Sequence, residues 1–242
     1  MQAFILAAGL GTRLQPLTNT KPKALVEVQG IPLIKIAIDN LIHHGATRIV
    51  VNIHHFADQL LTYIQNNRWN ADILISDERE TLLDTGGGLK NATPLFLPHE
   101  PILIHNVDIL THIDLAEVIR QHADSMNLAT LVVSQRSTSR QLLFDKRRQL
   151  AGWKNNTTGE IQWAYEPTSS CEQKAFSGIA AISPNLLDLL PPANHPYPII
   201  PAYLSLAKNH RISYFEHTSD NWLDVGKPET LQRAQSWWNF NF

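Results

Sequence analysis

The feature of this sequence that most restricts its fold is the alternation of short apolar runs with segments of helical periodicity. The runs from Gln2 to Ala7, Arg48 to Ile53 and Ala71 to Ser76 are typical of buried strands. Helix-period segments begin at Pro32 and at Phe56. Strands separated by helices predict right-handed crossovers and a mostly parallel sheet that is covered on both faces. We therefore expect a doubly wound, Rossmann-like α/β fold.

The pattern changes from Arg140 onward. The segments Gln141 to Asp145 and Gln149 to Lys154 alternate as a hairpin, and Glu160 to Tyr165 is again extended. Ala175 to Ile182 is expected to return to the main sheet. We therefore expect a small antiparallel extension on a mixed, mostly parallel sheet, in a place where such folds commonly hold a second substrate.

The end of the chain is rich in aromatic residues. A final helix is expected from Pro228 to Trp238, and Phe240 and Phe242 follow it. This aromatic tail is expected to pack on the body of the protein or on a second subunit.

Composition excludes several functional classes. The 242 residues are 43% hydrophobic and 17% charged, as in an ordinary globular protein. The formal net charge of −2 does not favour a general nucleic-acid surface, which usually shows a basic excess. Cys171 is the only cysteine, so a disulfide within the chain and a cysteine-based zinc site are excluded. Since no apolar run reaches the roughly 18–20 residues of a membrane span, we expect a cytoplasmic protein without a membrane or nucleic-acid partner.

The first predicted strand ends in the loop Gly9-Leu10-Gly11-Thr12-Arg13. Its glycines leave backbone N–H groups accessible and a basic residue follows them, which suits a phosphate group. The third glycine of the dinucleotide-binding fingerprint is missing, and no Lys-Ser or Lys-Thr pair makes the loop a P-loop. The loop is therefore either another kind of phosphate cradle or only a structural turn. Lys23 lies where the chain returns from it, either to meet the bound group or as a solvated surface residue.

Polar segments also follow later strands, at the edge of a parallel sheet where ligands bind. Pro101 to Asn106 is apolar enough to be a central strand, and it leads to Asp108. A carboxylate there suits a magnesium ion, and the alternative is a capping role in the next turn. Asp84 is followed closely by Gly86-Gly87-Gly88, whose backbone fits either a flat nucleobase or a tightly packed helix crossing.

Six segments, in this order, resemble the nucleotidyltransferases that make nucleoside-diphosphate sugars from a nucleoside triphosphate and a sugar 1-phosphate. They are Leu6-Ala7-Ala8-Gly9-x-Gly11-Thr12-Arg13-Leu14-x-Pro16-Leu17-Thr18, Lys21-Pro22-Lys23-x-Leu25, Leu83-Asp84-Thr85-Gly86-Gly87-Gly88, Asn106-Val107-Asp108, Phe176-Ser177-Gly178-Ile179 and Trp222-Leu223-Asp224-Val225-Gly226. The resemblance spans essentially the whole chain. Its short length and the Glu78-Arg79 pair before the third segment look most like the N-acetylmuramate 1-phosphate uridylyltransferases of cell-wall sugar salvage.

The resemblance implies a single nucleotidyltransferase domain over residues 1–242. Within it, residues from about 1–135 form the nucleotide-binding half and residues from about 136–225 form the sugar-binding half. Residues 228–242 form a C-terminal helix and tail.

The resemblance also implies roles for individual residues. Arg13, at the end of the loop, would lie on the β- and γ-phosphates, and Lys23 would neutralise the α-phosphate. Asp108 and Asp224 would hold Mg²⁺ between the phosphates of the two substrates, so that Arg13, Lys23 and Asp108 form the catalytic set. The implied nucleotide-binding residues are Leu6, Ala7, Ala8, Gly9, Gly11, Thr12, Arg13, Lys23, Asp84, Gly86 and Gly87.

The implied sugar site shows one departure from the family. Relatives with a Glu-Lys-Pro triplet have a lysine where this chain reads Tyr165-Glu166-Pro167. Arg140, before the predicted hairpin, is expected to supply the missing positive charge. The full set of expected sugar-binding residues is Asn106, Arg140, Gly152, Glu166, Ser177 and Gly178.

The expected reaction is in-line attack of a sugar phosphate oxygen on the α-phosphorus of the nucleotide, with loss of pyrophosphate. No general base is required, because a phosphate monoester is already ionised at neutral pH. UTP and N-acetylmuramate 1-phosphate are the favoured substrates, for a monomer or a small homo-oligomer. One alternative is a guanylyl-, thymidylyl- or cytidylyltransferase for another sugar or choline phosphate. A second alternative is a non-catalytic nucleotide-sugar-binding regulatory protein, which the complete set of charged motif residues disfavours.

Overall fold

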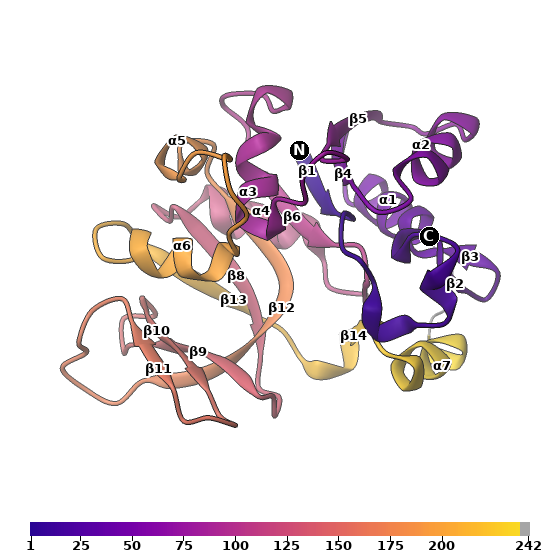
Figure 1. Ribbon diagram of the computed structural model, residues 1–242. Coiled ribbons are helices and arrows are strands. Elements are labelled where there is room, and N and C mark those ends of the chain that lie inside the picture. The colour runs from indigo at the N-terminus through magenta and orange to yellow at the C-terminus, as the bar shows by residue number, and fades with distance from the viewer. Residues whose placement is uncertain (238–242) are drawn as a thin grey trace.

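The computed structural model describes residues 1–237, which form a ten-stranded mixed sheet with helices on both faces (Figure 1). The pairs of β6 with β1, β1 with β4 and β4 with β5 are parallel, which confirms the predicted parallel core. The main path of the sheet runs in the order β11 (Ile161–Trp163), β10 (Leu150–Asn155), β9 (Arg140–Phe144), β12 (Glu172–Ile182), β6 (Ile102–Asn106), β1 (Gln2–Leu6), β4 (Arg48–Ile53) and β5 (Asp72–Asp77). Off this path, β8 (Ala129–Ser134) pairs with β12 and with β13 (Ile212–Glu216).

Side chains alternate along the central strands and feed two apolar clusters, one on each face of the sheet. In β1, Ala3 and Ile5 belong to one cluster, whereas Phe4 belongs to the other. The first cluster also takes residues from α1 (Leu33–His43), α2 (Ala57–Asn66), α4 (Leu115–Ala123) and α7 (Pro228–Trp237). The second takes residues from α3 (Asp84–Asn91), α5 (Leu186–Leu189) and α6 (Ile199–Leu206). Burial on both faces explains why the central strands are mostly apolar, and it confirms the doubly wound fold.

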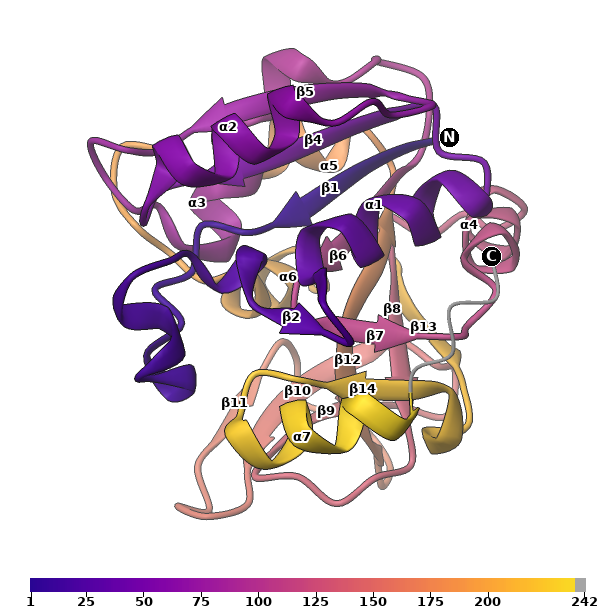
Figure 2. The ribbon, with the colours of Figure 1, turned by 90° about the vertical axis from the view of Figure 1, so that its right-hand side faces the viewer.

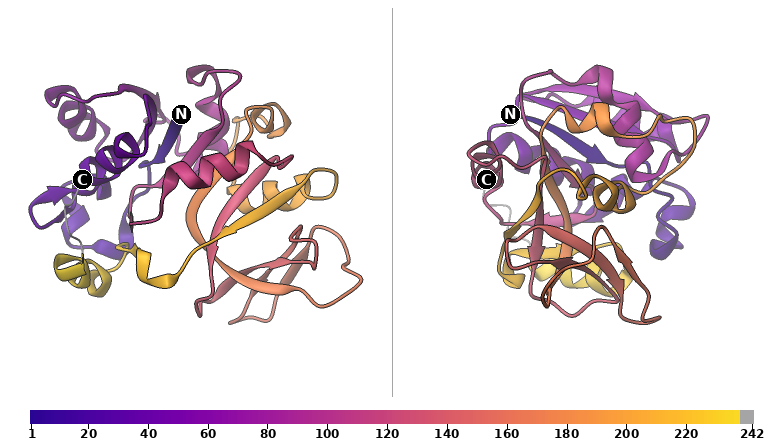
Figure 3. Two further views of the ribbon diagram at one scale, coloured as in Figure 1. Left: turned by 180° about the vertical axis from the view of Figure 1, so that it is seen from behind. Right: turned by 90° about the vertical axis from the view of Figure 1, so that its left-hand side faces the viewer.

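The figures show this layering directly. In Figure 2, α1 and α2 lie in front of β1, β4 and β5. Figure 3 shows α4 running across β8 on the side of the molecule hidden in Figure 1. Helices α1 and α2 confirm the helix-period segments predicted from Pro32 and Phe56.

The long strand β12 joins the main sheet to the antiparallel extension. Its first residues pair with β9 and its last residues pair with β6, both antiparallel. Between these regions the register against β8 shifts from Phe176 to Ala180, and Gly178 within the shift has a φ of +73°. Strands β9, β10 and β11 complete the extension, at the lower left of Figure 1, and confirm the predicted hairpin and its third strand.

Two short ribbons and five 3₁₀ turns complete the described part of the chain. The strand β7 (Ile109–Thr111) pairs antiparallel with β14 (Trp222–Asp224), so Asp224 lies opposite Ile109 and beside Asp108. The second ribbon joins β2 (Glu27–Val28) to β3 (Ile31–Pro32). The turns are η1 (Thr12–Leu14), η2 (Leu17–Asn19), η3 (Lys23–Leu25), η4 (Thr93–Leu95) and η5 (Ser219–Asn221).

At the C-terminal end, α7 follows the predicted helix to Trp237, and Trp238, Phe240 and Phe242 lie outside the described residues. Among residues 1–237, no helix combines the length and the hydropathy that a membrane crossing requires. The division of the domain at about residues 135 and 225 stays a prediction.

Candidate active site

The carboxyl ends of the parallel strands meet at one edge of the sheet. Leu6 at the end of β1 pairs with Asn106 at the end of β6, and Ile53 at the end of β4 pairs with Asp77 at the end of β5. The loops that leave these ends carry most of the residues that the sequence singled out. This edge is where ligands of open α/β sheets bind.

Four charged side chains converge at this edge. Lys23 Nζ donates a hydrogen bond to Asp108 Oδ2, and Arg13 Nη2 lies 3.8 Å from the same oxygen. The backbone N–H of Val225 donates to the Asp108 carbonyl at 2.9 Å, which fixes the chain that follows β14 against the end of β6. Asp224 is thereby held beside Asp108. The predicted grouping of two cations with two carboxylates is present in the structure.

Gly226 marks the centre of this charged cluster. Its N–H donates to Asp224 Oδ1 at 2.7 Å. A Cβ built on Gly226 would lie 2.6 Å from Arg13 Nη2 and 2.8 Å from both Asp108 Oδ2 and Asp224 Oδ1. The absence of a side chain at this position therefore allows the three charged groups to approach one another.

Asp224 lies in an environment that disfavours its charge. Burial first, and the neighbouring carboxylate of Asp108 second, raise the pKa of Asp224. The N–H of Gly226 and the charges of Arg13 and Lys23 act in the opposite direction. A site of this kind gains stability from a bound cation.

The donor set fits Mg²⁺ shared with a substrate. No group of three His, Cys, Asp or Glu side chains that could hold a metal ion occurs within residues 1–237. Two carboxylates, Asp108 and Asp224, nevertheless meet at the cluster. Mg²⁺ is usually bound through one or two carboxylates together with substrate phosphates rather than by a complete protein cage. The residues present are therefore compatible with that ion.

A cavity of about 470 Å³ opens beside the charged cluster. It is lined by Leu6, Ala8, Gly9, Arg13, Lys23, Asn52, Leu82, Asp84, Thr85, Asn106, Val107, Asp108 and Pro196. Of the expected nucleotide-binding residues, Leu6, Ala8, Gly9, Arg13, Lys23 and Asp84 line it, whereas Ala7, Gly11, Thr12, Gly86 and Gly87 do not.

The glycine-containing loop is only partly available as a phosphate cradle. The N–H groups of Ala7 and Ala8 donate to Asn52 Oδ1 at 2.7 and 3.2 Å, so these two amides are not free to bind a phosphate. Among the described residues, the N–H groups of Gly9, Leu10 and Gly11 have no hydrogen-bond acceptor. The predicted cradle is therefore restricted to the part of the loop that follows Ala8.

Gly11 shapes this loop rather than lining the cavity. Its φ is +67°, a conformation that favours glycine. A Cβ at this position would lie 2.8 Å from Thr18 Cγ2 and 3.1 Å from Lys23 Cβ. Gly11 thus lets the loop fold back onto the segment that carries Lys23.

The three glycines of α3 serve tight packing, which was one of the two alternatives left open. The N–H groups of Gly86 and Gly87 donate to the Tyr197 carbonyl at 2.9 and 3.2 Å. A Cβ on Gly86 would lie 2.4 Å from the Tyr197 ring, and one on Gly88 would lie 2.6 Å from Glu78 Oε1. Because their N–H groups are occupied, Gly86 and Gly87 cannot contact a base through them. Asp84 and Thr85, just before them, line the cavity instead.

The expected sugar-binding residues divide into two groups. Asn106 lines the first cavity, and Gly178 packs against it, since a Cβ on this glycine would lie 2.9 Å from Asn106 Nδ2. Ser177 is fully buried beside them. Arg140 lines a second cavity, of about 390 Å³, whose walls include Trp153 and Phe176.

Gly152 and Glu166 are not brought to either cavity. Gly152 packs against the extension itself, because a Cβ there would lie 2.7 Å from the Trp163 ring. Glu166 is exposed in the segment that follows β11 and lines neither space. The expectation that these two residues bind a sugar has no support in their positions.

Arg136 is a half-buried cation that was not predicted from the sequence. Its guanidinium donates to Ser134 Oγ at 2.9 Å and to the Phe176 carbonyl at 2.6 Å, and it stacks 4.0 Å from the centre of the Trp222 ring. Burial lowers the pKa of Arg136, and the nearby charge of Asp224 opposes this effect. Arg136 therefore ties β12 to the strand that carries Asp224.

A sequence signal for Arg136 did exist. Because β8 and β6 both run antiparallel to β12, β8 ends at the same edge of the sheet as β6. Arg136 follows the end of β8 by two residues. The rule that placed Asp108 at the site therefore applies equally to Arg136.

Comparison with known proteins agrees with the geometry. The nucleotidyl transferase family model matches residues 2–142. The chain is 46% identical over 109 residues to the N-acetylmuramate alpha-1-phosphate uridylyltransferase of Caulobacter vibrioides, covering 44% of this chain and 45% of that relative. It is 31% identical over 244 residues to the protein of the same name from Neisseria meningitidis serogroup B, covering 98% of this chain and 97% of that one.

Among solved structures, a putative glucose-1-phosphate thymidylyltransferase from Bacillus anthracis shares the fold, with a TM-score of 0.81 and 18% identity. The match covers 100% of this chain and 98% of that one. Since both the family model and a full-length relative agree, the chain belongs to the nucleotidyl transferase family, among its sugar-1-phosphate nucleotidyltransferases.

Proposed function

We propose that this protein transfers the uridylyl group of UTP to N-acetylmuramate 1-phosphate, giving the UDP-sugar and pyrophosphate. The names of the Caulobacter and Neisseria relatives support this pair of substrates. The observation that carries the reaction type is the convergence of Arg13, Lys23, Asp108 and Asp224 beside an open cavity. Such a cluster can neutralise two phosphate-bearing substrates that would otherwise repel each other.

The reaction requires charge neutralisation and alignment more than proton transfer. An oxygen of the sugar phosphate forms a bond to the α-phosphorus of UTP while the bond from that phosphorus to the bridging oxygen breaks, and pyrophosphate leaves with the electron pair. The attacking phosphate is already ionised, which agrees with a site that needs no general base. The residues of the site therefore act mainly by position and charge.

Lys23 and Arg13 are proposed to neutralise the phosphates of the nucleotide. The Lys23 side chain is only 12% exposed and is held by Asp108 at the cavity wall. The Arg13 side chain is 53% exposed, so it is free to turn toward a bound triphosphate. We assign the α-phosphate to Lys23 and the leaving pyrophosphate to Arg13, because the Lys23 side chain is the less exposed of the two.

Asp108 and Asp224 would hold Mg²⁺. When bound, this ion supplies Lewis-acid polarisation of the α-phosphate. The N–H of Gly226 and the chain pairing at Val225 keep the two carboxylates in place.

The second cavity is proposed to hold the sugar. Trp153 and Phe176 offer apolar walls for the sugar ring and its N-acetyl group, and Arg140 offers a cation at the rim. The lactyl carboxylate of N-acetylmuramate would pair with Arg140. Arg140 thereby takes the place of the missing sugar-site lysine.

The test is a substrate matrix read by pyrophosphate release and by mass spectrometry of the product. Each common nucleoside triphosphate is tested, in the presence of Mg²⁺, against the 1-phosphates of glucose, mannose, N-acetylglucosamine and N-acetylmuramate. Turnover concentrated on UTP with N-acetylmuramate 1-phosphate supports the proposal. Turnover with another pair would keep the reaction and replace the substrates, whereas nucleotide binding without any turnover would favour a regulatory protein.

A further inference from the structure

Asn52, at the carboxyl end of β4, connects two walls of the first cavity. Its Oδ1 accepts the N–H groups of Ala7 and Ala8 from the loop that follows β1. Its Nδ2 donates to Glu78 Oε1 at 2.8 Å. Asn52 is buried, with 2% of its surface exposed, and it lines the cavity itself. The orientation of its amide is fixed because the loop requires an acceptor and Glu78 requires a donor.

Glu78 continues this connection to the start of α3. Its Oε2 accepts the N–H of Leu83 at 3.1 Å, and the residue is only 3% exposed. No cation lies within salt-bridge distance of its carboxylate in the described chain. Burial raises the pKa of Glu78, while the hydrogen bonds from Asn52 and Leu83 lower it. A buried carboxylate without an ion pair is costly unless its two oxygens are used, as they are here.

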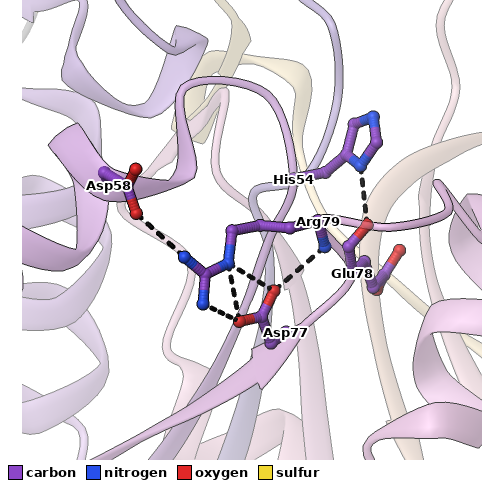
Figure 4. Close-up of polar contacts among 5 residues, drawn as sticks. All are labelled: His54, Asp58, Asp77, Glu78 and Arg79. Atoms are coloured by element: carbon purple, nitrogen blue, oxygen red, sulfur yellow. Dashed lines mark hydrogen bonds and ion pairs between the residues drawn. The ribbon is translucent and has the colours of Figure 1, made fainter.

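The neighbouring residues are arranged to keep Glu78 pointing inward. Figure 4 shows Arg79 turned away from it, bound to Asp77 and to Asp58 of α2. On the other side, His54 Nδ1 forms a hydrogen bond of 2.7 Å with the Glu78 carbonyl. The main chain at Glu78 is thus anchored to α2 and to the end of β4.

Gly88 of α3 packs closely against the side chains of Asn52 and Glu78. A Cβ on Gly88 would lie 2.6 Å from Glu78 Oε1 and 3.0 Å from Asn52 Nδ2. The glycine therefore lets α3 press directly on the Asn52–Glu78 pair. Any displacement of the pair changes the distance between the glycine loop and the beginning of α3.

We propose that Asn52 and Glu78 are positioning residues that hold the glycine loop and the segment from Leu82 to Thr85 at the separation required to grip a nucleoside triphosphate. This inference rests on the proposed function only in taking the cavity as the nucleotide site. The loop wall would bear the phosphates and the wall at Leu82 to Thr85 would face the base, so the pair sets the affinity for the whole nucleotide. Neither residue is assigned a contact with the reacting atoms.

Exchanging the amide of Asn52 and the carboxylate of Glu78 between the two positions tests this pattern of donors and acceptors. In Glu78→Gln, the new NH₂ must face either Asn52 Nδ2 or the N–H of Leu83, so two donors oppose each other. In Asn52→Asp, the new carboxylate oxygen faces Glu78 Oε1, so two acceptors oppose each other at a pH where both carboxylates are ionised. In the double variant, the carboxylate at position 52 accepts from the loop and from the amide NH₂ at position 78. The amide oxygen at position 78 then accepts the N–H of Leu83, so every hydrogen bond of the original pair is restored.

Two readouts are measured on the full chain. Hydrogen exchange at the Ala7, Ala8 and Leu83 amides reports on the connection itself, and the equilibrium dissociation constant for UTP reports on its consequence. We expect each single variant to exchange faster at these amides and to bind UTP about tenfold or more weakly, and the double variant to bind within about threefold of the unmodified protein. Glu80→Gln is the matched control, because this exposed residue of the same loop undergoes the same change of charge.

Two results would overturn the inference. One is a pair of single variants that keep the original exchange rates and UTP affinity. The other is a double variant that is no better than the worse single variant, since positioning through these hydrogen bonds predicts rescue when they are restored. Absence of nucleotide binding by the unmodified protein would instead refute the proposed function, and the exchange data would still decide whether the pair fixes the loop.

Discussion

Substitution of Gly226 by alanine tests whether turnover requires the close approach of the charged groups. Gly226 has an ordinary backbone conformation, so alanine introduces no backbone strain. Its Cβ, however, would lie 2.6 Å from Arg13 Nη2 and 2.8 Å from the carboxylate oxygens of Asp108 and Asp224. Ordinary contacts begin near 3.4 Å, so the carboxylates or the backbone between them must move by roughly 0.6 Å or more.

The expected loss follows from this displacement. A misplacement of about 1 Å in a catalytic group lowers the rate by about 10²-fold, and we expect a fall in kcat of that order for Gly226→Ala. The free energy of unfolding should change by no more than about 1 kcal/mol, because alanine also reduces the conformational freedom of the unfolded chain. Activity and stability are therefore expected to separate.

The assay is steady-state pyrophosphate release with saturating substrates, together with urea unfolding of the same preparations. Gly159→Ala is a control in which stability should fall while kcat is kept, the reverse of the result expected for Gly226→Ala. Gly159 has a φ of +77°, and a Cβ there would meet no atom within 4 Å. This control should lose about 1 kcal/mol of stability and keep its kcat. A Gly226→Ala enzyme with kcat within about threefold of the original would refute the assigned role of the cluster.

Four further predictions concern single residues. Asp108→Asn should lower pyrophosphate release by about 10³-fold or more with the fold intact, because a charge at the site is removed without a change in volume. Lys23→Ala should lower kcat by about 10²–10³-fold, because the cation proposed to neutralise the α-phosphate is lost. Arg140→Gln should raise the KM for N-acetylmuramate 1-phosphate about tenfold and leave the KM for UTP unchanged, because only the sugar carboxylate loses its partner. Both ring nitrogens of buried His105 lack a hydrogen-bond partner among the described residues, and burial lowers its pKa from 6.5 to about 4. Between pH 6.5 and about 4, the unfolded chain binds a proton that the folded chain does not. His105 should therefore reduce the free energy of unfolding by up to about 3 kcal/mol as the pH falls through this window. His105→Leu should remove that pH dependence in urea titrations.

Each of these predictions has a contradicting result. Near-normal turnover by Asp108→Asn would exclude a metal-binding role, and an unchanged kcat in Lys23→Ala would make the lysine a structural partner of Asp108. Equal effects of Arg140→Gln on both KM values would remove the second cavity from the sugar site. A pH dependence of unfolding that persists in His105→Leu would assign it to other groups.

The layered fold could be predicted because the apolar runs and the helix-period segments show which residues are buried. The runs that became β1, β4 and β6 are mostly apolar, as expected for strands that are covered on both faces. The short ribbon of β7 and β14 was not predicted, because three-residue strands carry too little pattern. That ribbon nevertheless decides where Asp224 lies.

Contacts between distant segments could not be predicted from local patterns. The N–H groups of Gly86 and Gly87 donate to the carbonyl of Tyr197, which belongs to a segment that follows α5. Because the sequence does not show this contact, the three glycines could equally be interpreted as a site for a nucleobase. Arg136 stacks on Trp222 from another strand end, and no spacing in the sequence links the two. The Asn52–Glu78 connection likewise joins loops and strand ends through side chains that only the fold brings together.

Motif resemblance was most informative for the charged residues at the carboxyl edge of the sheet and least informative for the irregular segment that follows β11. Arg13, Lys23 and Asp108 lie together as the resemblance implied. Glu166 lies on the surface outside both cavities, since a short triplet in an irregular segment does not determine where that segment packs.

On the proposed function, the carboxyl edge of this sheet performs one direct in-line transfer, without a nucleophile from the protein. The most direct measurement is the stereochemical course of the reaction with one diastereomer of UTP in which sulfur replaces a non-bridging α-phosphate oxygen, read by ³¹P NMR of the nucleotide-sugar product. A single displacement predicts inversion at the α-phosphorus. Retention would require two displacements through a covalent nucleotidyl-enzyme and would contradict a direct transfer.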